Sequence, residues 1–243
     1  MWVRFGMLLT LVFLLAGCAI PVAGSPSPAA DPQLFPTDNN VPHTAPAVPP
    51  GVNSADLATD ITTAQRVVDL FWTRHWSDTF TGKYERPNIV GLYDGANPDP
   101  NVPTCAGVVL PPDNALYCPS SKFVAWDIGL MIAGSRIGDA WAYLIIAHEW
   151  GHAIQDQISV TLNAQQSELQ ADCFAGAALF GAVTDGTLKF EQGDTEEITR
   201  TLQAVADDTP WTSSEDHGSP AERINAFSLG RNGGVRACLP INN

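Results

Sequence analysis

Beyond residue 55, the pattern of apolar residues predicts helices at both ends of the region and short strands between them. Spacings of three and four predict helices over residues 60–76, 139–157, 164–182 and 194–208, and a shorter one that begins near Pro220 and stops at Gly230. Short apolar stretches separated by Pro, Gly and Asn predict strands within residues 88–95, 105–119 and 122–131. This order indicates an α+β domain, mainly helical, whose small antiparallel or mixed sheet precedes the second long helix.

The first 55 residues show neither of these helix and strand patterns. Residues 1–17 are typical of an export signal, because Arg4 precedes an apolar run too short to span a bilayer. The run ends in Leu-Ala-Gly-Cys, which resembles the lipobox of bacterial lipoproteins and predicts lipidation of Cys18; the alternative is an ordinary signal peptide cleaved nearby. Residues 18–55 hold nine of the 19 prolines and predict an extended tether. We therefore expect a domain over residues 56–243, lipid-anchored to the membrane on its extracytoplasmic side, in the cell envelope.

Charge narrows the range of partners. The formal net charge is −14, and it becomes −15 if Arg4 leaves with the signal. Nucleic acids and anionic lipid surfaces favour Lys and Arg, so neither is expected as a partner.

Four cysteines remain once Cys18 is set aside, and an even number in an exported chain predicts two disulfides. Four cysteines allow three pairings. We predict Cys105–Cys118, which closes a short turn-rich loop, and Cys173–Cys238, which staples the C-terminal tail. The competing hypothesis, a cysteine zinc site, lacks the Cys-x-x-Cys spacing of such sites.

The helix predicted over residues 139–157 carries two histidines on its apolar stripe. At about 100° per residue, His148 and His152 continue the stripe of Leu144, and Glu149 lies about 60° from His152. The alternative is two ordinary core histidines. However, two histidines one turn apart beside a carboxylate are costly to bury without a shared partner. A divalent metal is such a partner, because imidazoles at i and i+4 can reach one ion.

The next predicted helix places two carboxylates on one stripe. Glu168 and Asp172 are four residues apart and are followed by small and apolar residues. A solvated acidic face is the alternative, but inward carboxylates are unusual unless each has a task. Glu168 can supply the third protein ligand that a zinc site with two histidines lacks. Asp172 can accept the free N–H of a ligand histidine and fix its tautomer.

The segments HEWGHAIQ and ELQADCFAG resemble the bacterial putative neutral zinc metallopeptidase family, within the zincin group of glutamate-liganded enzymes such as thermolysin. The resemblance covers most of residues 60–230, is specific around the two helices, and includes YCPSSKFVAWD before the first of them. It implies a zincin-like metallopeptidase domain that binds one zinc ion per chain. The implied roles are zinc ligands for His148, His152 and Glu168, catalytic base for Glu149, and partner of a ligand histidine for Asp172.

Such a site predicts hydrolysis of peptide bonds in a peptide or protein substrate. A bound zinc would supply a water whose pKa is lowered to about 7, and Glu149 would take its proton. By analogy with related zincins, we expect an edge strand around residues 123–126 to pair with an extended peptide. We predict that His217 donates a hydrogen bond to the oxyanion that develops in the transition state. The alternative for the region is a loop histidine near a surface arginine, Arg223.

Two other functions use the same residues. A catalytically degenerate zincin would act as a binding or assembly lipoprotein, with its zinc structural or absent. Against this alternative, every residue that the chemistry requires is present. Hydrolysis of a non-protein amide, such as a cell-wall cross-link, would use the same site chemistry.

Overall fold

The computed structural model describes residues 27–28, 40–41, 45–47, 54–210, 212–213 and 216–240. The predicted export signal, Cys18 and most of the predicted tether lie outside these residues, so the domain limits and the lipidation stay predictions. Within the described ranges, no helix is both long enough and apolar enough to cross a membrane.

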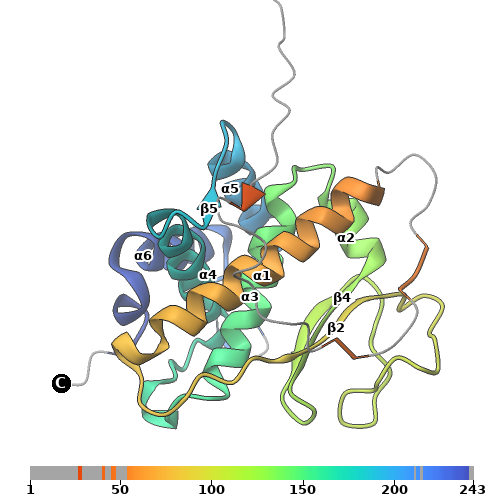
Figure 1. The fold of residues 1–243 in the computed structure, drawn as a ribbon, viewed down its shortest axis with the longest axis horizontal. Helices are drawn as coiled ribbons and strands as arrows, with labels where there is room; N and C mark the ends of the chain where they lie inside the picture. The colour runs from red at the N-terminus through yellow and green to blue at the C-terminus, as the bar shows by residue number, and fades with distance from the viewer. Residues whose placement is uncertain are drawn as a thin grey trace, which may run out of the picture.

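Three long helices form the centre of the domain: α1 (Ser54–Thr79), α3 (Ala140–Gln155) and α4 (Ser167–Thr184). Figure 1 shows α1 crossing in front of α3 and α4, with strands β2 and β4 on one side and α6 on the other. Aromatic side chains fill the contact between the three helices. Trp72 of α1, Trp150 of α3 and Phe174 of α4 are completely buried. The predicted helices are therefore present, although α1 begins before residue 60.

The small sheet has three strands, β2 (Asn88–Tyr93), β3 (Ala115–Cys118) and β4 (Phe123–Asp127). Their order is β2-β4-β3, with β4 parallel to β2 and antiparallel to β3. The domain is thus α+β with a mixed sheet, as predicted. All five residues of β4 are buried: strands lie on both of its edges, and helices α2 (Ile128–Gly134) and α3 also contact it.

This strand order corrects the expected position of the substrate-binding edge. Residues 123–126 belong to the central strand β4, whose backbone groups already pair with β2 and β3. Strand β3 lies at one edge of the sheet, and among the described residues no strand pairs with its outer side. The stretch 122–131 also continues beyond the strand as helix α2 (Ile128–Gly134), because the Asp127 carboxylate caps it by accepting hydrogen bonds from two backbone N–H groups.

The C-terminal part adds helices α5 (Asp194–Ala204) and α6 (Pro220–Ala237). The predicted stop at Gly230 is wrong, because α6 continues to Ala237 with a kink at Gly234. Gly230 instead permits close contact with α4, since a Cβ atom there would lie 1.8 Å from the carbonyl oxygen of Cys173. Both predicted disulfides are confirmed, Cys105–Cys118 and Cys173–Cys238.

Short pieces of the predicted tether contact the domain. Strand β1 (Ser27–Pro28) pairs antiparallel with β5 (Leu188–Lys189), the strand that follows α4. Asn40 forms a bridge with Ile89 of β2, and the N–H of Val41 donates to the carbonyl oxygen of Ile89 at 2.7 Å. These segments therefore lie against the domain at two separate places.

Candidate zinc site

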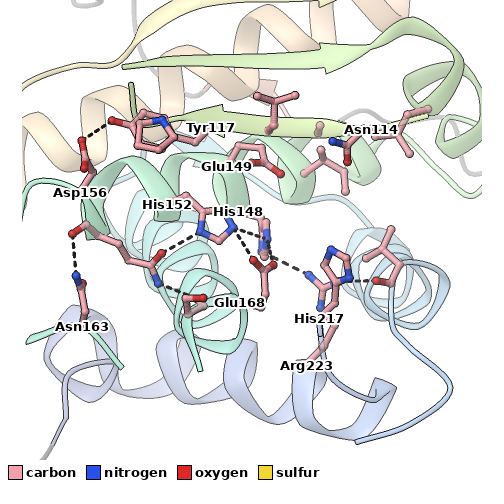
Figure 2. A pocket seen from close by; sticks show the side chains of 18 of the residues that line it. Asn114, Tyr117, His148, Glu149, His152, Asp156, Asn163, Glu168, His217 and Arg223 are labelled. Carbon is pink, nitrogen blue, oxygen red and sulfur yellow. Dashed lines mark hydrogen bonds and ion pairs between the residues drawn. The ribbon is translucent and has the colours of Figure 1, made fainter. Parts of the chain in front are cut away.

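Helices α3 and α4 bring the two predicted histidines and the predicted glutamate to one point. The Nε2 atoms of His148 and His152 are 3.2 Å apart. One carboxylate oxygen of Glu168 lies 3.1 Å from Nε2 of His148, and the other lies 3.3 Å from Nε2 of His152. Figure 2 shows the three side chains converging from the two helices. Three residues that span twenty positions of the chain thus bring their possible ligand atoms to one place.

The donor set fits a zinc ion. A tetrahedral ion with ligands at about 2.0–2.1 Å separates neighbouring ligand atoms by about 3.3 Å. This is close to the 3.2 Å between the two Nε2 atoms and to the shortest distance from each Nε2 atom to the Glu168 carboxylate. The Nδ1 atoms of both histidines face side-chain oxygens, Asp172 Oδ1 at 2.8 Å and Gln155 Oε1 at 2.9 Å. When the imidazoles are neutral, as a metal requires, these contacts place their protons on Nδ1 and leave lone pairs on both Nε2 atoms. Two lone pairs and a carboxylate would repel one another unless a cation lay between them.

The partner of His148 is itself held by a buried arginine. Asp172 is completely buried and accepts hydrogen bonds from Nε and Nη2 of Arg223, both at 2.8 Å. Arg223 is 3% exposed and also donates to the carbonyl oxygen of Val205 at 2.6 Å. The alternative of a surface arginine is therefore wrong. Asp172 lies where a residue that orients His148 should lie, and Arg223 compensates its buried charge.

In the metal-free protein, this cluster binds protons tightly. Burial lowers the pKa of His148, but the carboxylates of Asp172 and Glu168 outweigh burial and raise that pKa to about 10. Burial likewise raises the pKa of Glu168, but its contacts with both histidines bring it well below the usual range. Because ligand histidines must be neutral, zinc has to displace protons here, and zinc binding should weaken as the pH falls.

The predicted base, Glu149, lies beside this point and faces the sheet. Its side chain is 7% exposed, and its carboxylate accepts a hydrogen bond from the backbone N–H of Tyr117 in β3. Burial raises the pKa of Glu149, and the neighbouring histidines oppose that rise. A carboxylate with a raised pKa is suited to taking up a proton near neutral pH.

A cleft of about 980 Å³ gives access to the site. Its lining includes Ala115 and Tyr117 of β3, Glu149 of α3, and His217 and Arg223 on the far side (Figure 2). His217 has a side chain 53% exposed, with Nδ1 3.6 Å from a carboxylate oxygen of Asp207. The structure thus brings His217 to the same cleft as the predicted zinc ligands, and its own role stays a prediction.

Two glutamines beside the candidate ligands were not predicted from the sequence to have a role. Gln155 contacts Nδ1 of His152, and Gln170 in turn contacts the amide of Gln155 at 3.1 Å. The sequence spacing could have indicated the contact of Gln155, because this residue follows His152 by three positions and so lies on the same side of α3. Gln170 belongs to the motif of the second helix but received no role.

A second group of acidic side chains lies near the start of α3 and contains Asp139, Asp194 and Glu197. Burial, together with the neighbouring charges of Asp139 and Glu197, raises the pKa of Asp194 to about 6. This group has no histidine, so it lacks the donor set of a catalytic zinc site.

Gly151, between the two histidines, allows α3 and α4 to approach closely. A Cβ atom at this position would lie 2.9 Å from both Cα and the carbonyl oxygen of Ala171. We expect Gly151→Ala to lower the free energy of unfolding by about 1–3 kcal/mol, because the backbone of α4 must move. A Gly→Ala change inside a helix normally stabilises by about 0.5–1 kcal/mol, so the expected sign is reversed. Chemical denaturation measures the effect, and a more stable variant would contradict it.

The site and its surroundings define a class of protein. Two histidines from a His-Glu-x-x-His helix, a glutamate from the next helix and an adjoining buried carboxylate are the arrangement of glutamate-liganded zinc hydrolases. The chain belongs to the family described as putative neutral zinc metallopeptidase, whose model matches residues 51–238.

Its curated relatives include two proteins named as uncharacterized. The chain is 29% identical over 187 residues to Rv2575 of Mycobacterium tuberculosis, covering 64% of this chain and 61% of that protein. It is 30% identical over 146 residues to YpfJ of Escherichia coli K12, covering 49% of this chain and 50% of that protein. The chain thus spans between half and two thirds of the length of these relatives. No solved structure matches it.

Proposed function

We propose that this protein is a zinc-dependent peptidase that hydrolyses peptide bonds in peptides or proteins of the cell envelope, held to the membrane by a lipid at Cys18. The observation that carries the proposal is the geometry of His148, His152 and Glu168. Their ligand atoms lie within 4.8 Å of one another, beside the buried Glu149 in an accessible cleft. The anchor rests on the lipobox-like segment alone.

The chain's own residues divide the chemistry between them. A zinc ion bound by the three ligands would supply a water of lowered pKa and polarise the scissile carbonyl. Glu149 would take the water proton and pass it to the leaving amine. The N–H of Tyr117 fixes the Glu149 carboxylate for this transfer, because the hydrogen bond joins it to the rigid sheet. His217, across the cleft, would donate to the developing oxyanion.

Strand β3 supports an extended peptide as substrate. The N–H of Tyr117 points away from β4 and toward Glu149, and backbone groups alternate in direction along a strand. Ala115, two residues earlier, therefore presents its N–H and C=O to the cleft as well. A peptide could pair with these groups as an added strand.

The charged side chains of the cleft favour cleavage within a chain rather than at its carboxyl end. Among the cleft-lining residues that the structure describes, Arg223 is the single Lys or Arg. Its guanidinium group already donates hydrogen bonds to the Asp172 carboxylate and to the carbonyl oxygen of Val205. A terminal carboxylate would find no free arginine or lysine among these residues.

Metal removal and return tests the proposal. The zinc-loaded mature chain should cleave an unfolded protein such as casein, detected as new peptides by mass spectrometry. A chelator should abolish cleavage and added zinc should restore it, because the water to be activated is held by the metal. Zinc-loaded protein that cleaves neither casein nor cross-linked cell-wall peptides would overturn the proposal and favour a degenerate binding protein. Cleavage of the cell-wall peptides alone would assign the site to a non-protein amide.

A further inference from the structure

The second zinc histidine is bonded to a chain of two glutamines. His152 Nδ1 lies 2.9 Å from Oε1 of Gln155, at the end of the same helix. The Nε2 amide of Gln155 donates to the carbonyl oxygen of Ser167 at 2.7 Å and to Oε1 of Gln170 at 3.1 Å. Gln155 therefore connects α3 to the first turn of α4, the turn that carries Glu168.

Gln170 is buried and makes every hydrogen bond that a primary amide can make. It is 3% exposed. Its Nε2 donates to the carbonyl oxygens of Leu162 at 2.8 Å and Cys238 at 3.0 Å. Its Oε1 accepts from the N–H of Ala164 at 3.0 Å as well as from Gln155. Two donors and two lone pairs are thus all used.

These contacts determine the direction of each hydrogen bond in the chain. A backbone N–H can only donate and a backbone carbonyl can only accept, so Ala164, Leu162 and Cys238 fix which end of the Gln170 amide is oxygen. The Gln170 oxygen then requires the NH₂ group of Gln155, as does the carbonyl oxygen of Ser167. The oxygen of Gln155 is left facing His152, and it requires a proton on Nδ1.

The last link of the chain is covalent. Cys238, whose carbonyl oxygen accepts from Gln170, forms the disulfide with Cys173 in α4. The C-terminal end of α6 is thereby fastened one turn from Gln170. The backbone that directs the amides is held by the disulfide on one side and by the loop at residues 162–167 on the other.

We propose that Gln155 and Gln170 form a hydrogen-bond relay that holds His152 in the Nδ1–H tautomer, with Nε2 free for zinc, and that the disulfide-bonded tail anchors this relay. Gln155 is a positioning residue, comparable in effect to Asp172 at His148 but built from neutral amides. The inference rests on the proposed zinc site. It adds a role for the glutamines of the two helices, Gln155 in α3 and Gln170 in α4.

The test compares Gln155→Leu with Gln157→Leu as a matched control. Gln157 also makes side-chain hydrogen bonds, with Glu85 and Ala153, near the end of the same helix but not with a histidine. Zinc affinity is measured by competition with a chelator of known affinity. Loss of a residue that orients a ligand histidine typically weakens metal binding about 10–100-fold, which is the change expected for Gln155→Leu. Gln157→Leu should bind zinc as the wild type does.

A second measurement separates orientation of His152 from general stability. In zinc-loaded wild-type protein, proton–nitrogen NMR should show a proton on Nδ1 of His152 that exchanges slowly with water. In Gln155→Leu this signal should broaden or disappear, whereas the corresponding His148 signal should persist. Wild-type zinc affinity together with an unchanged His152 signal in Gln155→Leu would overturn the relay.

The disulfides provide the test of the anchor. The double variant Cys173→Ala/Cys238→Ala should bind zinc more weakly, and Cys105→Ala/Cys118→Ala should not, because the latter disulfide lies at the end of β3. Equal zinc affinity in the two double variants would overturn the role of the tail.

If the wild type binds no zinc, the proposed function itself fails. If the wild type binds zinc tightly, and Gln155→Leu keeps both that affinity and the His152 signal, the relay alone fails.

Discussion

Replacing Glu149 with glutamine is expected to lower kcat/KM for peptide cleavage by about 10²–10⁴-fold, the usual contribution of a general base. Glutamine keeps the size of the side chain and can still accept the N–H of Tyr117, but it cannot take a proton from water. Zinc should stay bound at about one ion per chain, because Glu149 is not among the three ligands. Cleavage assays and metal analysis on the same samples measure both effects.

Asp156→Asn is the matched control for this variant. Asp156 is an exposed carboxylate in the same cleft and accepts a hydrogen bond from the Tyr117 hydroxyl at 2.8 Å, which asparagine can also do. Its kcat/KM should stay close to that of the wild type. Full activity in Glu149→Gln would exclude Glu149 as the base, and zinc loss in that variant would indicate a structural effect instead.

Replacing Glu168 with alanine is expected to remove zinc binding at zinc concentrations that saturate the wild type. The change takes away the single protein ligand from α4 and leaves two histidines, too few for a catalytic site. A ligand present at about 100 times its dissociation constant stabilises the folded state by about 2.7 kcal/mol, so zinc should raise the Tm of the wild type. The Tm of Glu168→Ala should not respond to zinc.

Glu197→Gln serves as the control for the metal measurement. Glu197 belongs to the second acidic group and accepts the N–H of Ala140, which glutamine can also do. Its zinc content and its zinc-dependent Tm shift should equal those of the wild type. Zinc retained at wild-type affinity in Glu168→Ala would remove Glu168 from the ligand set.

Much of the candidate zinc site could be predicted from the sequence because helical geometry is local. The spacing of four residues places His148 and His152 on one side of α3, and the same spacing places Glu168 and Asp172 on one side of α4. The disulfide partners could also be predicted, since the Cys105–Cys118 loop is short and Cys238 lies near the chain end. These features depend on distances along the chain, which a sequence contains.

The order of the strands could not be predicted in this way. Residues 123–126 have the apolar character of a strand, but a sequence does not state which strands lie on either side. The structure places β4 between two partners and β3 at the edge beside Glu149. The end of α6 was misjudged for a related reason, because Gly230 is required by contact with α4 rather than by the end of a helix.

The sequence by itself determined the long central helices, the pairing of the cysteines and the candidate zinc-binding residues, because each follows from periodicity or chemistry within short segments. Only the tertiary structure decided what surrounds those residues. The charge of Asp172 is compensated by Arg223, fifty-one positions later, and Gln170 bonds to Cys238, sixty-eight positions later. Burial makes such contacts necessary, because a charge or an amide removed from water must find a partner wherever the fold brings one.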